Sequence, residues 1–136
     1  MIKLINLLKE NKLEQYKKGR SESHSGYKLT KASNVDELLS NIKHIDGYLD
    51  LSRSNVTEIP KDLIIDGYLS LSNTKIQNLP TGLIVNGDLD LINCKNIKSF
   101  PSDLTVNGNL ILNSKLFDKQ QLKKQLPNVG NIIIML

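Results

Sequence analysis

Hydrophobic and polar residues alternate along this chain in short runs that return about every twenty residues. The clearest runs begin at Gly47, Gly67 and Gly87, each of which is followed by the pattern x-Leu-x-Leu. Strict alternation directs the leucines of such a run to one face of a β-strand and the intervening residues to the other. A period of about twenty is too short for a helix pair or a propeller blade, and it is typical of a solenoid whose coils stack their apolar residues.

The repeated run predicts one parallel sheet that receives a strand from each coil. Asp or Asn precedes each glycine, and these pairs predict a turn or bulge ahead of the strand because glycine accepts a positive φ. Proline follows an apolar residue on the return side of successive coils, where no ladder hydrogen bond has to be donated. The predicted strands lie near residues 27–31, 48–52, 68–72, 88–92, 109–113 and 131–135.

The inward positions of two middle coils are the predicted core. Leucine, isoleucine and valine occupy matching places in both coils, so each apolar side chain is expected to stack on its equivalent one coil away. The upper set is Leu49, Leu51, Val56, Ile59 and Leu63, and the lower set is Leu69, Leu71, Ile76, Leu79 and Leu83.

Helical spacing of apolar residues marks the start of the chain. Residues 2–18 carry this spacing, and Gly19 follows where a helix would end. The chain therefore divides into residues 1–25, a helix and loop acting as a cap or a basic arm, and residues 26–136, the repeat domain.

Two shorter helices are predicted within the repeat domain. One lies near residues 35–43, where Asn34 and Glu37 are spaced as a capping box. The other lies near residues 119–126, with Asp118 as its N-cap. The fold expected from the sequence is thus an α/β-type solenoid.

The charge of the chain is concentrated at its N-terminus. The formal net charge of the 136 residues is +4, but residues 1–31 alone carry eight basic and three acidic groups. The remaining residues carry ten basic and eleven acidic groups and are nearly neutral. A basic arm suits nucleic acid, which is the alternative function to weigh against protein binding.

Motifs for catalysis or metal binding are not found in the sequence. The chain has one cysteine, Cys94, no Cys/His pair with metal-ligand spacing, and no phosphate-binding loop or nucleophile elbow. Asp50 and Asp90 could act as an acid and base pair, but they fall two coils apart, roughly 10 Å at strand spacing. We expect a protein that is not an enzyme, needs no cofactor or metal, has no signal peptide or membrane span, and works in the cytoplasm.

Three successive coils resemble leucine-rich repeats, in particular the short Leu-Pro repeats of bacterial and bacteriophage proteins. The resemblance implies right-handed coils and protein recognition through the sheet face. The family usually has asparagine at the sixth motif position, which here holds serine, threonine or cysteine. The matching motifs are Leu49-x-Leu51-x-x-Ser54-x-Val56, Leu69-x-Leu71-x-x-Thr74-x-Ile76 and Leu89-x-Leu91-x-x-Cys94-x-x-Ile97.

Outward residues of the predicted strands are the candidate partner-binding site. Tyrosines beside carboxylates make an aromatic and acidic surface, which selects a basic partner. The function expected is a non-catalytic protein-binding module, such as a small bacterial or phage inhibitor or adaptor. The candidate residues are Tyr48, Asp50, Ser52, Tyr68, Ser70, Ser72, Asp88, Asp90, Ile92, Asn109, Ile111 and Asn113.

The last predicted strand is also a candidate dimer interface. It is the most apolar stretch of the chain and contains no proline or charge. We expect it to pair edge to edge with a second copy as an antiparallel two-fold dimer, or to receive a strand from the target protein. The residues of this edge are Asn131, Ile132, Ile133, Ile134 and Met135.

Overall fold

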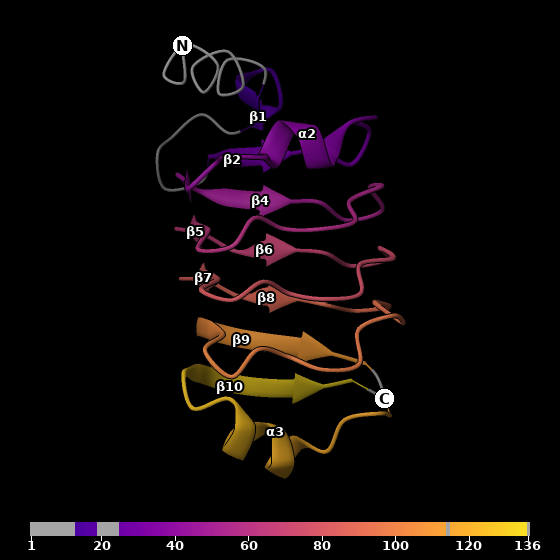
Figure 1. The fold of residues 1–136 in the computed structure, drawn as a ribbon, viewed down its shortest axis with the longest axis vertical. Coiled ribbons are helices and arrows are strands. Elements are labelled where there is room, and N and C mark those ends of the chain that lie inside the picture. The colour runs from indigo at the N-terminus through magenta and orange to yellow at the C-terminus, as the bar shows by residue number, and fades with distance from the viewer. Residues whose placement is uncertain (1–12, 19–24, 114, 136) are drawn as a thin grey trace.

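The described part of the chain is an α/β fold with one open, mixed sheet of ten strands and two helices. The structure is a computed structural model, and it describes residues 13–18, 25–113 and 115–135. Figure 1 shows the strands stacked one above another between the two ends of the molecule. The helices are α2 (Val35–Leu39) and α3 (Lys119–Gln125), and the strands are β1 (Lys17–Lys18), β2 (Gly26–Lys28), β3 (His44–Ile45), β4 (Tyr48–Asp50), β5 (Ile64–Ile65), β6 (Leu69–Ser70), β7 (Ile84–Val85), β8 (Leu89–Asp90), β9 (Thr105–Leu112) and β10 (Val129–Ile134).

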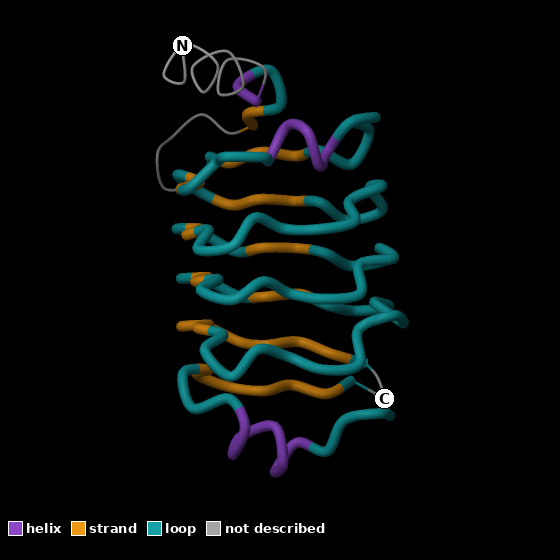
Figure 2. Tube along the Cα trace, in the orientation of Figure 1, coloured by secondary structure: helices purple, strands orange, loops and turns teal. Residues whose placement is uncertain are grey.

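The strands form two parallel series that β9 joins (Figure 2). Strands β2, β4, β6 and β8 pair in that order, and β3, β5 and β7 pair in the same way. The first residues of β9 pair with β7, its last residues pair with β8, and β10 pairs with β9. The sequence predicted only the first series. The expectation of one strand per repeat was wrong because two-residue strands are too short to show a period of two.

The main-series strands in the middle of the stack are shorter than predicted. Strands β6 and β8 contain two residues each, where five were expected. The chain leaves the sheet at Asn73 and Asn93, whose φ angles of 59° and 61° lie in the left-handed region. Asparagine adopts this region more readily than most residues, so the chain turns there, three residues after each strand ends.

Glycine precedes the main-series strands because neighbouring repeats approach too closely there for a side chain. The Gly67 N–H donates to the Gly47 carbonyl at 2.8 Å, and the Gly87 N–H donates to the Gly67 carbonyl at 3.0 Å. A Cβ on Gly87 would lie 2.8 Å from the Gly67 carbonyl carbon. Only Gly47 of these three has a positive φ, at 97°. The prediction of turns that require positive φ was therefore wrong for the other two.

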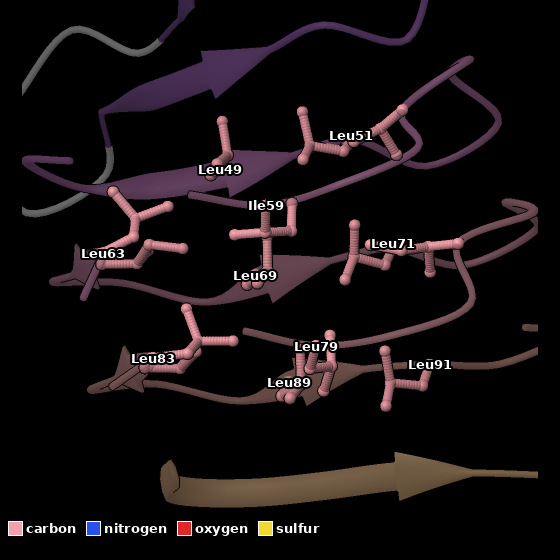
Figure 3. Close-up of a cluster of buried hydrophobic side chains, with 14 of the residues drawn as sticks. Leu49, Leu51, Ile59, Leu63, Leu69, Leu71, Leu79, Leu83, Leu89 and Leu91 are labelled. Carbon is pink, nitrogen blue, oxygen red and sulfur yellow. The ribbon is translucent and has the colours of Figure 1, made fainter. Parts of the chain in front are cut away.

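The predicted core is confirmed. Leu49, Leu69 and Leu89 lie in register on successive strands, and Figure 3 shows them as one column of stacked side chains. Full burial of one such leucine stabilises the fold by about 1.5–3 kcal/mol. All members of both predicted sets are buried: Leu49, Leu51, Val56, Ile59, Leu63, Leu69, Leu71, Ile76, Leu79 and Leu83.

A buried thiol joins neighbouring repeats from inside the stack. The Leu71 carbonyl accepts hydrogen bonds from Thr74 Oγ1 at 2.7 Å and from Cys94 Sγ at 2.9 Å. Cys94 belongs to the following repeat, so its thiol bridges two layers. Burial raises the pKa of this thiol, and the charge of Asp90 raises it further. Hydrogen bonds with Thr74 lower the pKa but do not outweigh burial, so the pKa lies above its usual value. The cysteine therefore stays protonated and takes part in packing.

Helix α2 is shorter than predicted, and the expected capping box is not formed. Asn34 occupies the N-cap position, but its side chain makes no capping hydrogen bond. Asp36 instead joins the helix to the next repeat, where it accepts hydrogen bonds from the Thr57 side chain and from the N–H groups of Thr57 and Glu58. Partial burial raises the pKa of Asp36, but these three hydrogen bonds outweigh it and hold the pKa below its usual value.

Helix α3 confirms its predicted position and cap. The Asp118 carboxylate accepts the N–H groups of Gln120 at 2.8 Å and Gln121 at 3.1 Å. The helix lies at the C-terminal end of the stack, beyond β10 (Figure 1), with Leu122 buried.

Neither α2 nor α3, nor any other helix among the described residues, has the length and apolar character that crossing a membrane requires.

The predicted N-terminal helix falls mostly on residues 1–12, which lie outside the described residues. Its predicted end is wrong, because Lys17–Lys18 form strand β1, which pairs antiparallel with β2. The Glu14 carboxylate accepts a hydrogen bond from the Tyr27 hydroxyl at 2.8 Å. These contacts hold the end of the segment against the first layer of the sheet.

Candidate partner-binding face

Outward side chains of the main-series strands form one continuous surface, which we call the outer face. The strand register places equivalent residues beside one another at each layer, so the surface consists of three rows. All twelve predicted partner-binding residues lie on it. The first row is Tyr48, Tyr68, Asp88, Asn109 and Asn131; the second is Lys28, Asp50, Ser70, Asp90, Ile111 and Ile133; the third is Ser52, Ser72, Ile92, Asn113 and Met135.

A stacked pair of tyrosines is the main aromatic feature of the outer face. The rings of Tyr48 and Tyr68 are 4.9 Å apart between centroids and only 2° from parallel. Tyr68 is 40% exposed and Tyr48 is half-buried. Burial raises the pKa of Tyr68, and Asp50 and Tyr48 raise it further. The Tyr68 hydroxyl therefore stays neutral and can donate a hydrogen bond.

Three carboxylates around the tyrosines are held in fixed orientations by main-chain groups. The Asp50 Oδ1 atom accepts the Ser52 N–H at 3.0 Å and the Ser52 hydroxyl at 2.6 Å. Asp88 Oδ1 accepts the Asn109 N–H at 2.7 Å, and Asp90 Oδ1 accepts the Ile92 N–H at 2.9 Å. Each carboxylate thus uses one oxygen to fix its position, and the other oxygen has no hydrogen-bond partner in the part of the chain that the structure describes.

The charge of these carboxylates is not neutralised by described side chains. Among residues 13–18, 25–113 and 115–135, the one carboxylate within 4.0 Å of a basic side chain is Asp66, which lies 2.8 Å from His44 Nε2 on the second strand series. Lys28 stands beside Asp50 in the second row. The central part of the outer face is therefore aromatic and acidic.

The C-terminal part of the outer face is apolar. Ile111 and Ile133 are neighbours in the second row, and Ile92 lies in the third row one repeat earlier. Ile133 is 36% exposed and Met135 is 51% exposed. The face thus changes from acidic to apolar along the stack.

Asparagine side chains border the third row. Asn93 Nδ2 donates to Asn73 Oδ1 at 3.0 Å, and Asn113 Nδ2 donates to Asn93 Oδ1 at 2.8 Å. Ser70, by contrast, is buried within the face, with its hydroxyl 3.3 Å from that of Ser72. The asparagine and serine side chains thus bond to one another, which holds them in place and leaves few of their polar groups for a partner.

The twelve predicted partner-binding residues leave out four members of the rows and a second surface. Lys28 lies in the first layer, and counting one period back from Asp50 identifies it. Asn131, Ile133 and Met135 lie in the last layer, and the sequence assigned them to the dimer edge.

The second surface belongs to the short strand series, where His44, Ile64 and Ile84 lie in register and Ile64 is 37% exposed. Nothing in two-residue runs would have signalled it.

The two carboxylates weighed as an acid and base pair do not lie side by side. Ser70 lies between Asp50 and Asp90 in the second row, so the two carboxylates belong to strands two layers apart. Within the described ranges, no three His, Cys, Asp or Glu side chains are grouped so as to hold a metal ion. A cavity of about 300 Å³ beside Cys94, Phe100 and Phe117 shares only Asn113 with the outer face.

No protein-family model matches this chain, and no curated protein or solved structure matches it. The function is therefore argued from the chemistry of the outer face.

Proposed function

We propose that this chain is a leucine-rich-repeat-like solenoid that binds a protein partner through its outer face and catalyses no reaction. The regular pairing of Leu49, Leu69, Leu89 and Leu110 on successive parallel strands supports a solenoid. In such a stack the outward residues carry little of the stability, so they are free to specify a partner. An inhibitor or adaptor role suits a surface of this kind.

The observation that carries the proposal is the stacked pair of Tyr48 and Tyr68 with carboxylates on neighbouring strands. Tyrosine is favoured at the centre of interfaces because it offers a large, rigid contact area and a hydroxyl. Asp50 and Asp88 are already held by main-chain hydrogen bonds, so ordering them on binding costs little entropy. A site built in this way binds its partner without rearrangement.

The partner segment that fits the face best is basic, and arginine suits it better than lysine. A guanidinium group stacks on a tyrosine ring and also forms paired hydrogen bonds with a carboxylate. The exposed Tyr68 ring and the second oxygen of Asp88 or Asp90 offer both interactions on adjoining strands. An extended peptide segment with two or more arginines would lie along the rows, crossing from one strand to the next.

Selection from a displayed library of random peptides tests this proposal without assuming a target. Selected peptides should be rich in arginine, and their affinity should fall about tenfold in Tyr68→Ala or in Asp88→Asn, as expected for the loss of one interface anchor. Asp88→Asn removes the charge but keeps an oxygen that can accept the Asn109 N–H.

Glu58→Gln is the matched control, because it removes one negative charge from an exposed residue outside the outer face. It should leave the affinity unchanged. Selected peptides without basic residues, or peptides that bind Tyr68→Ala as well as the wild-type protein, would contradict the proposal.

Nucleic-acid binding through the basic residues 1–31 remains the alternative. The described part of this arm presents exposed Lys17 and Lys18 on β1. This alternative predicts a mobility shift with labelled DNA or RNA that weakens steeply as salt rises and is lost in a Lys17→Glu, Lys18→Glu variant. No shift at low salt would exclude it.

A further inference from the structure

The outer face changes from acidic to apolar between β8 and β9. In the second row, Asp90 lies beside Ile111, and Ile111 lies beside Ile133. The layers of β4, β6 and β8 carry the three carboxylates of the face, whereas the described outward residues of β9 and β10 carry no charge. Contacts with arginine account for the acidic part alone, so the apolar part is available to a different kind of side chain.

Exposed hydrophobic side chains gather on the outer face. The described residues include five large hydrophobic side chains that are exposed, and three of them lie on this face: Tyr68 at 40%, Ile133 at 36% and Met135 at 51%. The half-buried Ile92 and Ile111 lie on the intervening layers. An apolar patch of this kind, bordered by polar residues, marks an interaction surface.

The layer spacing suits one extended segment that crosses both parts of the face. Neighbouring strands lie about 4.8 Å apart, so the five layers β4, β6, β8, β9 and β10 span about 19 Å. Side chains on one side of an extended chain recur about every 6.7 Å, so four of them span about 20 Å. A segment of about seven residues therefore places two side chains over the acidic layers and two over the apolar layers.

We propose that the partner segment is extended and carries two arginines and two apolar residues at alternate positions, with the two arginines together at one end. The arginines stack on the rings of Tyr48 and Tyr68 and bind a carboxylate of β8. The apolar side chains pack on Ile111 and Ile133. This inference rests on the proposed function and specifies the class of peptide that the outer face selects.

The two parts of the face fix the order of the segment. An arginine over Ile111 or Ile133 would lose water without gaining a carboxylate, since the described outward residues of these layers are uncharged. A leucine over Asp90 would remove water from the carboxylate oxygen that has no hydrogen-bond partner among the described residues. Each misplacement costs affinity, so the face discriminates against the same residues in another order.

Isothermal titration calorimetry with short peptides, blocked at both ends, tests the order. The arginine–leucine peptide is Arg-Ser-Arg-Ser-Leu-Ser-Leu, and the arginine–serine peptide has serine in place of both leucines. Each is also made with its sequence reversed, and the chain direction that binds more tightly is used throughout. The arginine–leucine peptide should bind about tenfold more tightly, because its leucines are partly buried on the face. The interleaved peptide Arg-Ser-Leu-Ser-Arg-Ser-Leu, of the same composition, should lose most of this gain.

Ile133→Ser separates the two parts of the face. It should weaken the arginine–leucine peptide about fivefold and leave the arginine–serine peptide unchanged, because only the leucines contact Ile133. Ile64→Ser is the matched control: Ile64 is 37% exposed but lies on the second strand series, so both peptides should keep their affinity. Both isoleucines are partly exposed, so circular dichroism should show both variants folded. Asp88→Asn should weaken the two peptides by the same factor.

The outcomes separate this inference from the proposed function. Binding of the arginine–serine peptide that depends on Asp88, with no gain from the leucines or no effect of Ile133→Ser, would overturn the inference and leave the proposed function standing. Equal binding of the interleaved peptide would also overturn the inference alone. If no peptide binds at concentrations up to about 1 mM, the inference and the proposed function both fail.

Discussion

The N–H of Gly67 donates to the carbonyl oxygen of Gly47 at 2.8 Å, and a Cβ on Gly67 would lie 2.9 Å from the carbonyl carbon of Gly47. The same contact recurs one layer further on, between Gly87 and Gly67. These glycines form a column in which backbone lies directly on backbone. The repeat distance of the stack is set there, because no side chain separates the layers.

Gly67→Ala should therefore destabilise the protein by about 1–3 kcal/mol, the usual range for inserting a methyl group where the surroundings cannot yield. The atoms around the new Cβ are main-chain atoms, which cannot move as a flexible side chain can. The measurement is the urea midpoint of unfolding, with exposed Thr81→Ala as the control. A Gly67→Ala midpoint equal to that of the control would disprove the close-contact explanation.

Leu71→Ala should cost about 2–5 kcal/mol of unfolding free energy, since Leu71 is fully buried and the neighbouring layers hold the cavity open. Urea unfolding measures this cost. The exposed Lys75→Ala, four residues later, should change stability by less than about 0.5 kcal/mol. Equal effects of the two substitutions would contradict the assigned core.

Alternation of leucine and polar residues predicted the core and the outward side of the twelve candidate residues correctly, and it placed the main strand series but made its middle strands too long. Side chains alternate between the two faces of a strand. Placing Leu69 in the core therefore places its neighbour Tyr68 on the outer face. The second strand series was missed because Ile64 and Ile65 are too few residues to show any period. The sequence attributed these glycines to turns with a positive φ. In the structure Gly67 is required because its backbone contacts that of Gly47, and a contact between residues twenty positions apart cannot be seen in the local sequence.

The candidate site was predictable in its residues but not in its detail. The positions of Asp50, Asp88 and Tyr68 follow from the repeat. The hydrogen bonds that orient the carboxylates depend on the exact path of the chain after each strand, and the sequence does not specify that path. The end of the N-terminal segment at Lys17 and Lys18 was likewise decided by pairing with β2, which overrides local helical spacing.

Arg53→Asn should stabilise the protein by about 0.5–1 kcal/mol. Arg53 has a φ of 59°, in the left-handed region that asparagine tolerates better than arginine. The same position in the next two repeats holds Asn73 and Asn93, whose side chains are hydrogen-bonded to each other. The thermal midpoint measures the gain, and Arg53→Ala, which lacks the amide, should not reproduce it. A loss of stability in Arg53→Asn would contradict this account of the turn.

Stability should fall above pH 10 in a way that depends on Tyr68. Burial, then Asp50 and Tyr48, raise the pKa of Tyr68 above its usual value of 10.0. The folded protein then keeps the phenolic proton at a pH where the unfolded chain has lost it. The stabilisation is fully present below the unfolded value and is lost as the pH rises through the folded pKa. Tyr68→Phe keeps the ring but should lose less unfolding free energy than wild type between about pH 9 and about pH 11. Identical pH profiles would show that Tyr68 does not titrate in this environment.

The most direct test of the central claim is a titration of the isotopically labelled protein with an arginine-rich peptide, followed by amide chemical shifts. Binding through the outer face predicts saturable shifts at Tyr48, Asp50, Tyr68, Asp88 and Asp90, lost in Tyr68→Ala and absent with a glutamate-rich peptide of the same length. Saturable shifts that lie instead along Lys17 and Lys18 or on α3, or equal binding of the glutamate-rich peptide, would contradict the account.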